Sequence, residues 1–209
     1  MDGMTILLSD PRVAAVPVRD CGEPLVRLGA RFGPARALVR VGLADRLAAA
    51  TLPRGVRLRV LEGHRSLSAQ HAIVARYTRE VRRAHPAVVD PTEVARLVSR
   101  FVSPVDVAPH VAGAAVDLTL VDASGRELDL GTPVDATPEE SDGRCATADD
   151  RISPEARAHR DLLARALGDV GLVNYPTEWW HWSVGDRYWA LTTGAPYALY
   201  GPVDVAVAA

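Results

Sequence analysis

Two segments of this chain carry side chains suited to binding a divalent metal, and their spacing limits how the chain can fold. The first holds His110 and Asp117, and the second holds Glu178 and His181. Seven residues separate His110 from Asp117, so one unbroken strand would point them to opposite faces. A helix is disfavoured there, because Gly113 and two valines lie between them. A shared site therefore requires His110 on a loop, a turn at Gly113 and Asp117 on a strand.

The second segment needs a bend for the same reason. Glu178 and His181 lie three residues apart, so they cannot share one face of a strand. Two histidines and one aspartate supply three ligands and leave the fourth position of a tetrahedral zinc ion open to water, as in catalytic sites. A glutamate beside the last ligand can transfer a proton to or from that water. The pattern predicts a metal-dependent hydrolase with one Zn²⁺ per chain.

Length and composition narrow the class of protein. A chain of 209 residues fits a single domain with a substantial core. The net charge of -2 with mixed signs predicts no nucleic-acid partner. All 24 basic residues are arginine, which excludes a lysine nucleophile. The N-terminus lacks the features of a secretory signal and no apolar run is long enough to span a membrane, so we expect a cytoplasmic protein without a membrane partner.

The two cysteines do not form a disulfide framework. Cys21 and Cys145 are too few and too far apart for a cysteine zinc site, and in a cytosolic protein we expect them to be reduced. A single disulfide between them stays open at this point, as does the oligomeric state.

Hydrophobic periodicity and turn residues predict an α+β domain. The expected helices are residues 35–50, Ser66 to about 83, 92–101 and 154–168, and the expected strands are residues 56–61, 114–120 and 172–175. Residues 131–150 are predicted to form a long loop, and long loops in compact domains often have a function. We expect a mainly antiparallel sheet with helices packed against it and the zinc site in a central cleft.

The sequence around the predicted ligands resembles that of a known family. Residues 109–120, Pro-His-Val-Ala-Gly-Ala-Ala-Val-Asp-Leu-Thr-Leu, resemble the Ser-x-His-x-x-Gly-x-Ala-x-Asp signature of the D-alanyl-D-alanine dipeptidases. Residues 175–182 are similar to that family's Glu-x-x-His block. Residues 61–65 look like its arginine segment, and residues 130–135 like its Met-Gly-x-x-Phe-Asp loop. The four blocks occur in the family's order and cover most of residues 20 to 200, the expected catalytic core.

The resemblance implies a role for each matching residue. The implied zinc ligands are His110, Asp117 and His181, and the implied catalytic acid/base is Glu178. Arg65 would stabilise the oxyanion, and Asp135 would receive the free ammonium group of the dipeptide. The family hydrolyses the free dipeptide D-Ala-D-Ala, which depletes the cell-wall terminus that glycopeptide antibiotics bind. The resemblance thus implies that residues 1–209 form a single zinc dipeptidase domain acting on D-Ala-D-Ala or a related dipeptide.

The match departs from the family pattern at four positions. Ala108 stands where the signature has serine, and Pro109 stands where relatives often have serine. Relatives often carry arginine where Ala112 stands, and phenylalanine where Val134 stands. The first three positions lie near the expected place of the substrate's C-terminal end, so a related dipeptide remains open as the substrate.

Several other readings remain open from the sequence. One keeps the fold and cleaves longer wall peptides, as a D,D-carboxypeptidase or endopeptidase of the same superfamily. Another is a non-haem iron enzyme, because two histidines and a carboxylate also form that facial triad. A third is a non-catalytic zinc-binding module. For single residues, Arg65 can instead form a salt bridge with Glu62, and Asp135 can be a solvated acid in an acidic loop.

Overall fold

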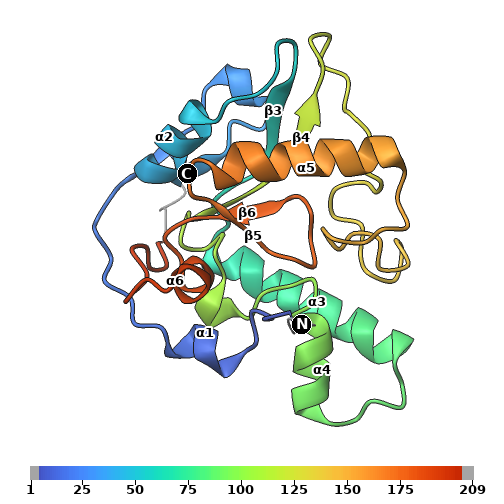
Figure 1. Ribbon diagram of the computed structural model, residues 1–209. Coiled ribbons are helices and arrows are strands. Elements are labelled where there is room, and N and C mark those ends of the chain that lie inside the picture. Colours follow the sequence, from blue (N-terminus) through green and yellow to red (C-terminus); the bar gives the residue numbers. More distant parts are fainter. Residues whose placement is uncertain (1–4, 204–209) are drawn as a thin grey trace.

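A four-stranded antiparallel sheet forms the centre of the molecule in the computed structural model, which describes residues 5–203 (Figure 1). In spatial order its strands are β3 (Arg57–Glu62), β4 (Ala115–Val121), β6 (His181–Ser183) and β5 (Val173–Asn174). A separate antiparallel pair consists of β1 (Leu25–Arg27) and β2 (Leu38–Arg40). The expected α+β class with a mainly antiparallel sheet is confirmed.

Helices surround this sheet. They are α1 (Pro11–Ala15), α2 (Val41–Ala49), α3 (Leu67–Ala84), α4 (Pro91–Val98), α5 (Pro154–Gly168) and α6 (Arg187–Thr193), with 3₁₀ turns η1 (Ala30–Phe32) and η2 (Val105–Val107). Side-chain caps start the longer ones: the Ser66 hydroxyl accepts from the Ala69 backbone, and the Ser153 hydroxyl accepts from the Ala156 backbone. Both α3 and α5 begin where they were predicted, and serine is a preferred residue at the N-cap of a helix.

The two faces of β4 serve different purposes. On one face Val116, Leu118 and Leu120 are fully buried and share a core with Leu163 and Leu167 of α5, which crosses the sheet in Figure 1. The other face carries Asp117 and Thr119, yet all seven residues of β4 are buried. The polar face is therefore the floor of an internal cleft rather than a solvated surface.

The predicted helix over residues 35–50 is wrong in its first part. Residues 38–40 form β2, which pairs with β1, and the helix begins only at Val41. The apolar spacing of this stretch fits a helix, but pairing with a strand thirteen residues away gives its backbone other partners. The predicted helix over 92–101 also ends earlier, at Val98.

Arg40 joins three distant parts of the chain. Its buried guanidinium donates to the Ala112 carbonyl at 2.9 Å and to the Gly201 carbonyl at 3.0 Å, and it pairs with Asp20 at 2.8 Å. Next to Ala112, Gly113 has a φ of 65° and accepts from the Arg40 backbone N–H at 2.9 Å. Both chain ends thereby support the turn that precedes β4.

Within residues 5–203, no helix is both long and apolar enough to cross a membrane. Both cysteines are free: Cys21 is exposed and Cys145 is buried.

We predict that Gly113→Ala destabilises the protein more than Gly194→Ala. Both glycines have positive φ, so both changes carry the conformational cost of about 1 kcal/mol. At Gly113 a Cβ would also lie 2.3 Å from Leu25 Cδ2, whereas nothing lies within 4 Å at Gly194. Overpacking adds about 1–3 kcal/mol at Gly113 alone. Urea unfolding of both variants measures the difference, and equal losses would contradict this account of the turn.

Candidate metal centre

Strand register brings Asp117 and His181 together. In the antiparallel pairing of β4 with β6, Asp117 lies directly opposite His181. Directly opposed residues point to the same face of a sheet, with Cβ atoms about 4.5–5.5 Å apart. His181 Nδ1 lies 3.0 Å from Asp117 Oδ1, and both side chains are buried. One pair of opposed residues in the sheet thus joins two positions that are 64 residues apart in sequence.

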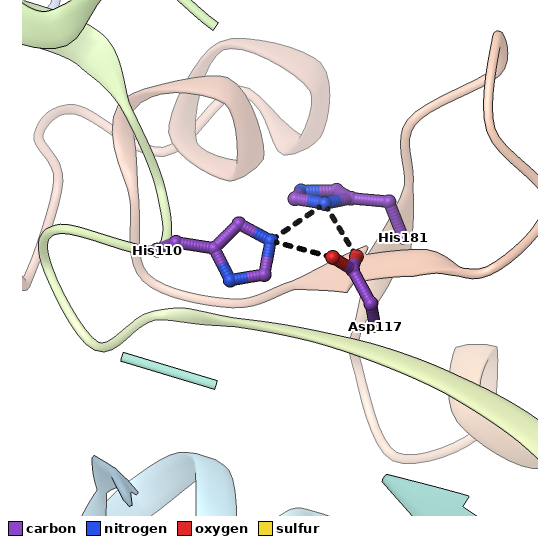
Figure 2. A group of neighbouring side chains, drawn as sticks. All are labelled: His110, Asp117 and His181. Carbon is purple, nitrogen blue, oxygen red and sulfur yellow. Dashed lines mark hydrogen bonds and ion pairs between the residues drawn. The ribbon is translucent and has the colours of Figure 1, made fainter. Parts of the chain in front are cut away.

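His110 reaches the same point from the turn before β4. Its Nδ1 lies 2.7 Å from the Gly63 carbonyl, which can only accept, so Nδ1 carries the hydrogen. The lone pair of Nε2 then faces His181 Nδ1 at 3.1 Å and Asp117 Oδ2 at 3.2 Å. Figure 2 shows the three side chains converging from the turn, β4 and β6. The loop, turn and strand predicted for this stretch are all present.

This arrangement fits a zinc ion. One ligand atom from each of His110, Asp117 and His181 lies within 4.8 Å of the other two. An imidazole lone pair aimed at a carboxylate is unfavourable unless a proton or a cation lies between them. The Gly63 carbonyl supplies the outer hydrogen bond that commonly orients a zinc-bound histidine. Two nitrogens and one carboxylate oxygen are typical ligands of a catalytic zinc.

Glu178 lies beside this group on the turn between β5 and β6. Its backbone N–H donates to the Tyr175 carbonyl at 2.9 Å, and its own carbonyl accepts from the Asn174 side chain at 2.9 Å. These contacts make the bend that sequence spacing requires between Glu178 and His181. The buried Glu178 carboxylate lies 3.9 Å from His181 Nδ1.

A β-bulge in β3 adds a second carboxylate to the same face. Val60 pairs with Leu118 and Glu62 pairs with Asp117, so Leu61 is an additional residue in this strand. The bulge turns Glu62 toward the site and leaves Leu61 partly exposed. Without it, Leu61 would lie opposite Asp117.

Glu62 and Gln70 together orient Arg65. The guanidinium donates to both Glu62 oxygens, at 2.7 and 2.5 Å, and to Gln70 Oε1 at 2.8 Å. Gln70 is 1% exposed and donates in turn to the Ser103 carbonyl. Arg65 therefore forms the salt bridge with Glu62 that the sequence left open, but inside the cleft. These contacts use three of its five N–H donors and leave two for another oxygen.

Asp135 lines the same cleft from the long loop. Its backbone is left-handed, with a φ of 63°, which is uncommon for a residue other than glycine. Burial, followed by the nearby carboxylates of Asp117 and Glu62, raises the pKa of Asp135 to about 6. The residue is nevertheless exposed, so Asp135 borders the cleft where it meets solvent.

The pKa shifts of the inner residues reflect crowded negative charge. Burial raises the pKa of the Glu178 carboxyl well above its ordinary range, and the charges of Asp117 and Asp135 add to this. For Asp117, burial acts in the same direction, but His110 and His181 outweigh it and hold its pKa far below normal. Burial lowers the pKa of His110, and Asp117 more than offsets this, so the net shift is upward. The group therefore favours binding of a cation.

All six predicted site residues border one cleft of about 400 Å³. The cleft lies between α3 and the face of the sheet that carries Asp117. Its lining includes four residues that the sequence analysis did not assign to the site: Leu8, Glu62, Gln70 and Tyr175. Gln70 carried a weak signal, because it lies five residues after Arg65 in the first turns of a capped helix. The other three depend on the bulge and on distant chain contacts, which no local pattern reveals.

Comparison with known proteins supports the same assignment. Residues 35–196 match the family described as D-ala-D-ala dipeptidase. The chain belongs to this family. It is 26% identical over 216 residues to a D-alanyl-D-alanine dipeptidase of Synechocystis sp., covering 84% of this chain and 87% of the relative. It is also 35% identical over 75 residues to the Escherichia coli (strain K12) D-alanyl-D-alanine dipeptidase, which covers 36% of this chain and 37% of that relative.

Membership in the D-Ala-D-Ala dipeptidase family makes this chain a metallopeptidase. Peptidase chemistry argues against the non-haem iron reading and against a purely structural zinc module. The possible His-Asp-His site lies within the matched residues, as do Arg65, Asp135 and Glu178.

We predict that Glu178→Gln stabilises the metal-free protein more at pH 8 than at pH 4. The pKa of folded Glu178 lies well above its ordinary value of 4.5. Above that ordinary value the unfolded chain releases the proton while the folded chain retains it, so wild-type stability falls as pH rises toward the folded pKa. The amide of the variant does not titrate. Thermal unfolding of both proteins in EDTA at pH 4 and pH 8 measures the difference in stability. A difference between variant and wild type that does not grow from pH 4 to pH 8 would contradict the prediction.

Proposed function

We propose that this chain is a zinc-dependent dipeptidase that hydrolyses D-Ala-D-Ala or a related D-amino-acid dipeptide. The observation that carries the proposal is the approach of His110, Asp117 and His181 to one point, with the Glu178 carboxylate 3.9 Å from His181. Three ligands plus an adjacent carboxylate are what metal-assisted amide hydrolysis requires. In this proposal one zinc ion binds per chain, and residues 1–209 act as one dipeptidase domain.

Glu178 is the proposed proton carrier. Zinc, when bound, lowers the pKa of a bound water to about 7 and polarises the scissile carbonyl. Glu178 accepts a proton from the attacking water and delivers it to the leaving amide nitrogen. Burial raises the pKa of Glu178 above that of an ordinary carboxyl, and proton transfer is most efficient when the pKa of the catalytic group approaches the working pH.

Arg65 is the proposed oxyanion donor. Arg65 borders the cleft in which the scissile carbonyl would lie, and its hydrogen bonds to Glu62 and Gln70 leave two N–H groups for a substrate oxygen. Contacts with Glu62 and Gln70 fix the guanidinium in advance, so that it need not reorganise when negative charge develops on the substrate oxygen. Glu62 and Gln70 act through Arg65 as positioning residues.

Asp135 is the proposed partner of the substrate's free ammonium group. The neighbouring carboxylates that raise its pKa also make this point of the cleft favourable for a positive charge. A requirement for a free amino terminus makes the enzyme an exopeptidase of small peptides rather than an endopeptidase of the wall. A cytoplasmic location remains a prediction from the sequence pattern, and a role in peptidoglycan metabolism or antibiotic resistance is a prediction that follows from the proposed substrate.

A screen of dipeptides tests the proposal directly. The purified protein, loaded with one equivalent of Zn²⁺, is incubated with D,D-, L,D- and L,L-Ala-Ala and with N-acetyl-D-Ala-D-Ala. We expect amino-acid release from the free D,D-dipeptide and little from the N-acetylated one. Preferential cleavage of the N-acetylated peptide would instead favour the D,D-carboxypeptidase reading, and no cleavage of any peptide would contradict both.

We predict that Glu178→Gln reduces kcat by about 10²- to 10⁴-fold while zinc content stays near one per chain. The amide keeps the shape of the side chain but does not accept a proton. Metal analysis and steady-state kinetics on the same preparation separate the two effects. A variant that loses zinc in proportion to activity would indicate a ligand rather than a proton carrier.

His181→Ala is expected to lose both zinc and the stability that zinc provides. Removing one of three ligands weakens binding, and metal binding is coupled to folding through deprotonated ligands. His71→Ala is the matched control, because His71 is exposed on α3. Bound zinc and the rise in Tm on adding Zn²⁺ are compared, and a normal zinc-dependent rise in His181→Ala would exclude it as a ligand.

A further inference from the structure

The long loop over residues 131–150 is held by one buried side chain of α5, both at its start and near its end. Arg160 Nε donates to the Leu130 carbonyl at 2.7 Å, immediately before the loop. Near the other end, its terminal nitrogens donate to the Ala146 carbonyl at 2.6 Å and to the Arg144 carbonyl at 2.8 Å. The guanidinium of Arg160 therefore holds the two ends of the loop together.

The partners of Arg160 in the loop are backbone carbonyls rather than carboxylates. The residue is 2% exposed, and burial lowers its pKa to about 10, so the side chain remains charged at neutral pH. Burying a cation is costly unless its donors are hydrogen-bonded, and here the loop carbonyls accept from them. Removal of the guanidinium would leave carbonyls at both ends of the loop without these donors.

Trp179 connects the same loop to the turn that carries Glu178. Its indole N–H donates to the Thr132 hydroxyl at 2.8 Å, and its backbone N–H donates to the Cys145 carbonyl at 3.1 Å. Trp179 is 2% exposed, and the Arg160 guanidinium lies 5.8 Å from the centroid of its ring. Because Trp179 directly follows Glu178 in sequence, these contacts fix the loop relative to the proposed proton carrier.

Asp135 depends on these contacts for its position. It lies three residues after Thr132, it is exposed, and its backbone has a φ of 63°. A non-glycine residue keeps such a conformation only where the surrounding structure enforces it. Asp135 and Glu178 border the same cleft, so the contacts of the loop set how far apart their carboxylates lie.

We propose that Arg160 and Thr132 are positioning residues, which hold Asp135 at the distance from Glu178 that fits a dipeptide with a free amino terminus. This inference rests on the dipeptidase function proposed above. In such a substrate the ammonium group and the scissile carbonyl belong to one residue, so a short and fixed span suits both. A contact with the ammonium group is made in the ground state and in the transition state alike, so its loss raises KM more than it lowers kcat.

A pair of variants at Thr132 tests the contact with Trp179. Thr132→Val removes the hydroxyl and keeps the shape of the side chain, whereas Thr132→Ser keeps an acceptor for the indole N–H. In the zinc-loaded protein we expect Thr132→Val to raise KM for D-Ala-D-Ala about 3- to 10-fold, with kcat and zinc content near wild type, and Thr132→Ser to restore KM. A lower kcat at unchanged KM is what a partly unfolded preparation gives, and it would overturn the proposal.

Combination with Asp135→Asn tests whether Thr132 acts through Asp135. Alone, Asp135→Asn should raise KM for D-Ala-D-Ala and reduce the preference for it over N-acetyl-D-Ala-D-Ala. Thr132→Val should then add no further change in that background, because contacts that act through one group are not additive. Two independent effects that multiply would overturn the positioning role.

The same measurements separate this inference from the proposed function. Wild-type KM in Asp135→Asn would overturn the ammonium site and the positioning role with it, while zinc-dependent hydrolysis would stand. No hydrolysis of any dipeptide by the wild type would overturn the proposed function and the inference together.

Arg160→Met tests the other positioning residue, with Arg165→Met as the matched control, because Arg165 is exposed on the same helix. We expect Arg160→Met to raise KM for D-Ala-D-Ala about 10-fold or more and to reduce the preference for it over the N-acetylated peptide. Arg165→Met should match the wild type in both. Wild-type KM in Arg160→Met would overturn its role, and if this variant does not fold, the Thr132 pair decides alone.

Discussion

The pairing of Asp117 with His181 across two antiparallel strands is the constraint on which the site depends. Side chains alternate along a strand, so a slip of one residue between β4 and β6 would move one of the two to the opposite face. The apolar side of β4 prevents that slip, because Leu118 and Leu120 would leave the core that they share with α5. The same burial that stabilises the sheet therefore fixes the geometry of the metal centre.

Carboxylates outnumber arginines in the lining of the cleft. Around the candidate metal site, Asp117, Glu178, Asp135 and Glu62 border the cleft, and Arg65 is hydrogen-bonded to Glu62 and Gln70. Burying a carboxylate without a partner is costly, and the raised pKa of the buried Glu178 expresses that cost. Partial desolvation and the neighbouring carboxylates also raise the pKa of the exposed Asp135. A divalent cation at one end and an ammonium group at the other would relieve it. The fold thus keeps an electrostatic strain that its proposed ligands remove.

Local signals in the sequence were enough for much of the fold. The Ser66 cap predicted the start of α3, and the amphipathic pattern from Pro154 to Gly168 predicted α5. The sequence patterns of β3 and β4 predicted strands. Strand β2 was missed, because its partner lies outside any local window. The bulge at Leu61 was missed too, because an additional residue in one strand can be recognised only from its pairing with the neighbouring strand. The roles of Arg65 and Asp135 remain predictions, whereas their placement in the cleft is a finding.

The contacts of Arg40 have a consequence for synthesis of the protein. The guanidinium supports the turn before β4 while it is itself held by Asp20 and by the carbonyl of Gly201. Contacts between residues this distant in sequence form late, because closing long loops costs entropy before it is repaid. A growing chain lacks Gly201 until every strand of the central sheet, from β3 to β6, has been synthesised. The turn before β4 therefore acquires its full set of Arg40 contacts only after all four strands are available to pair.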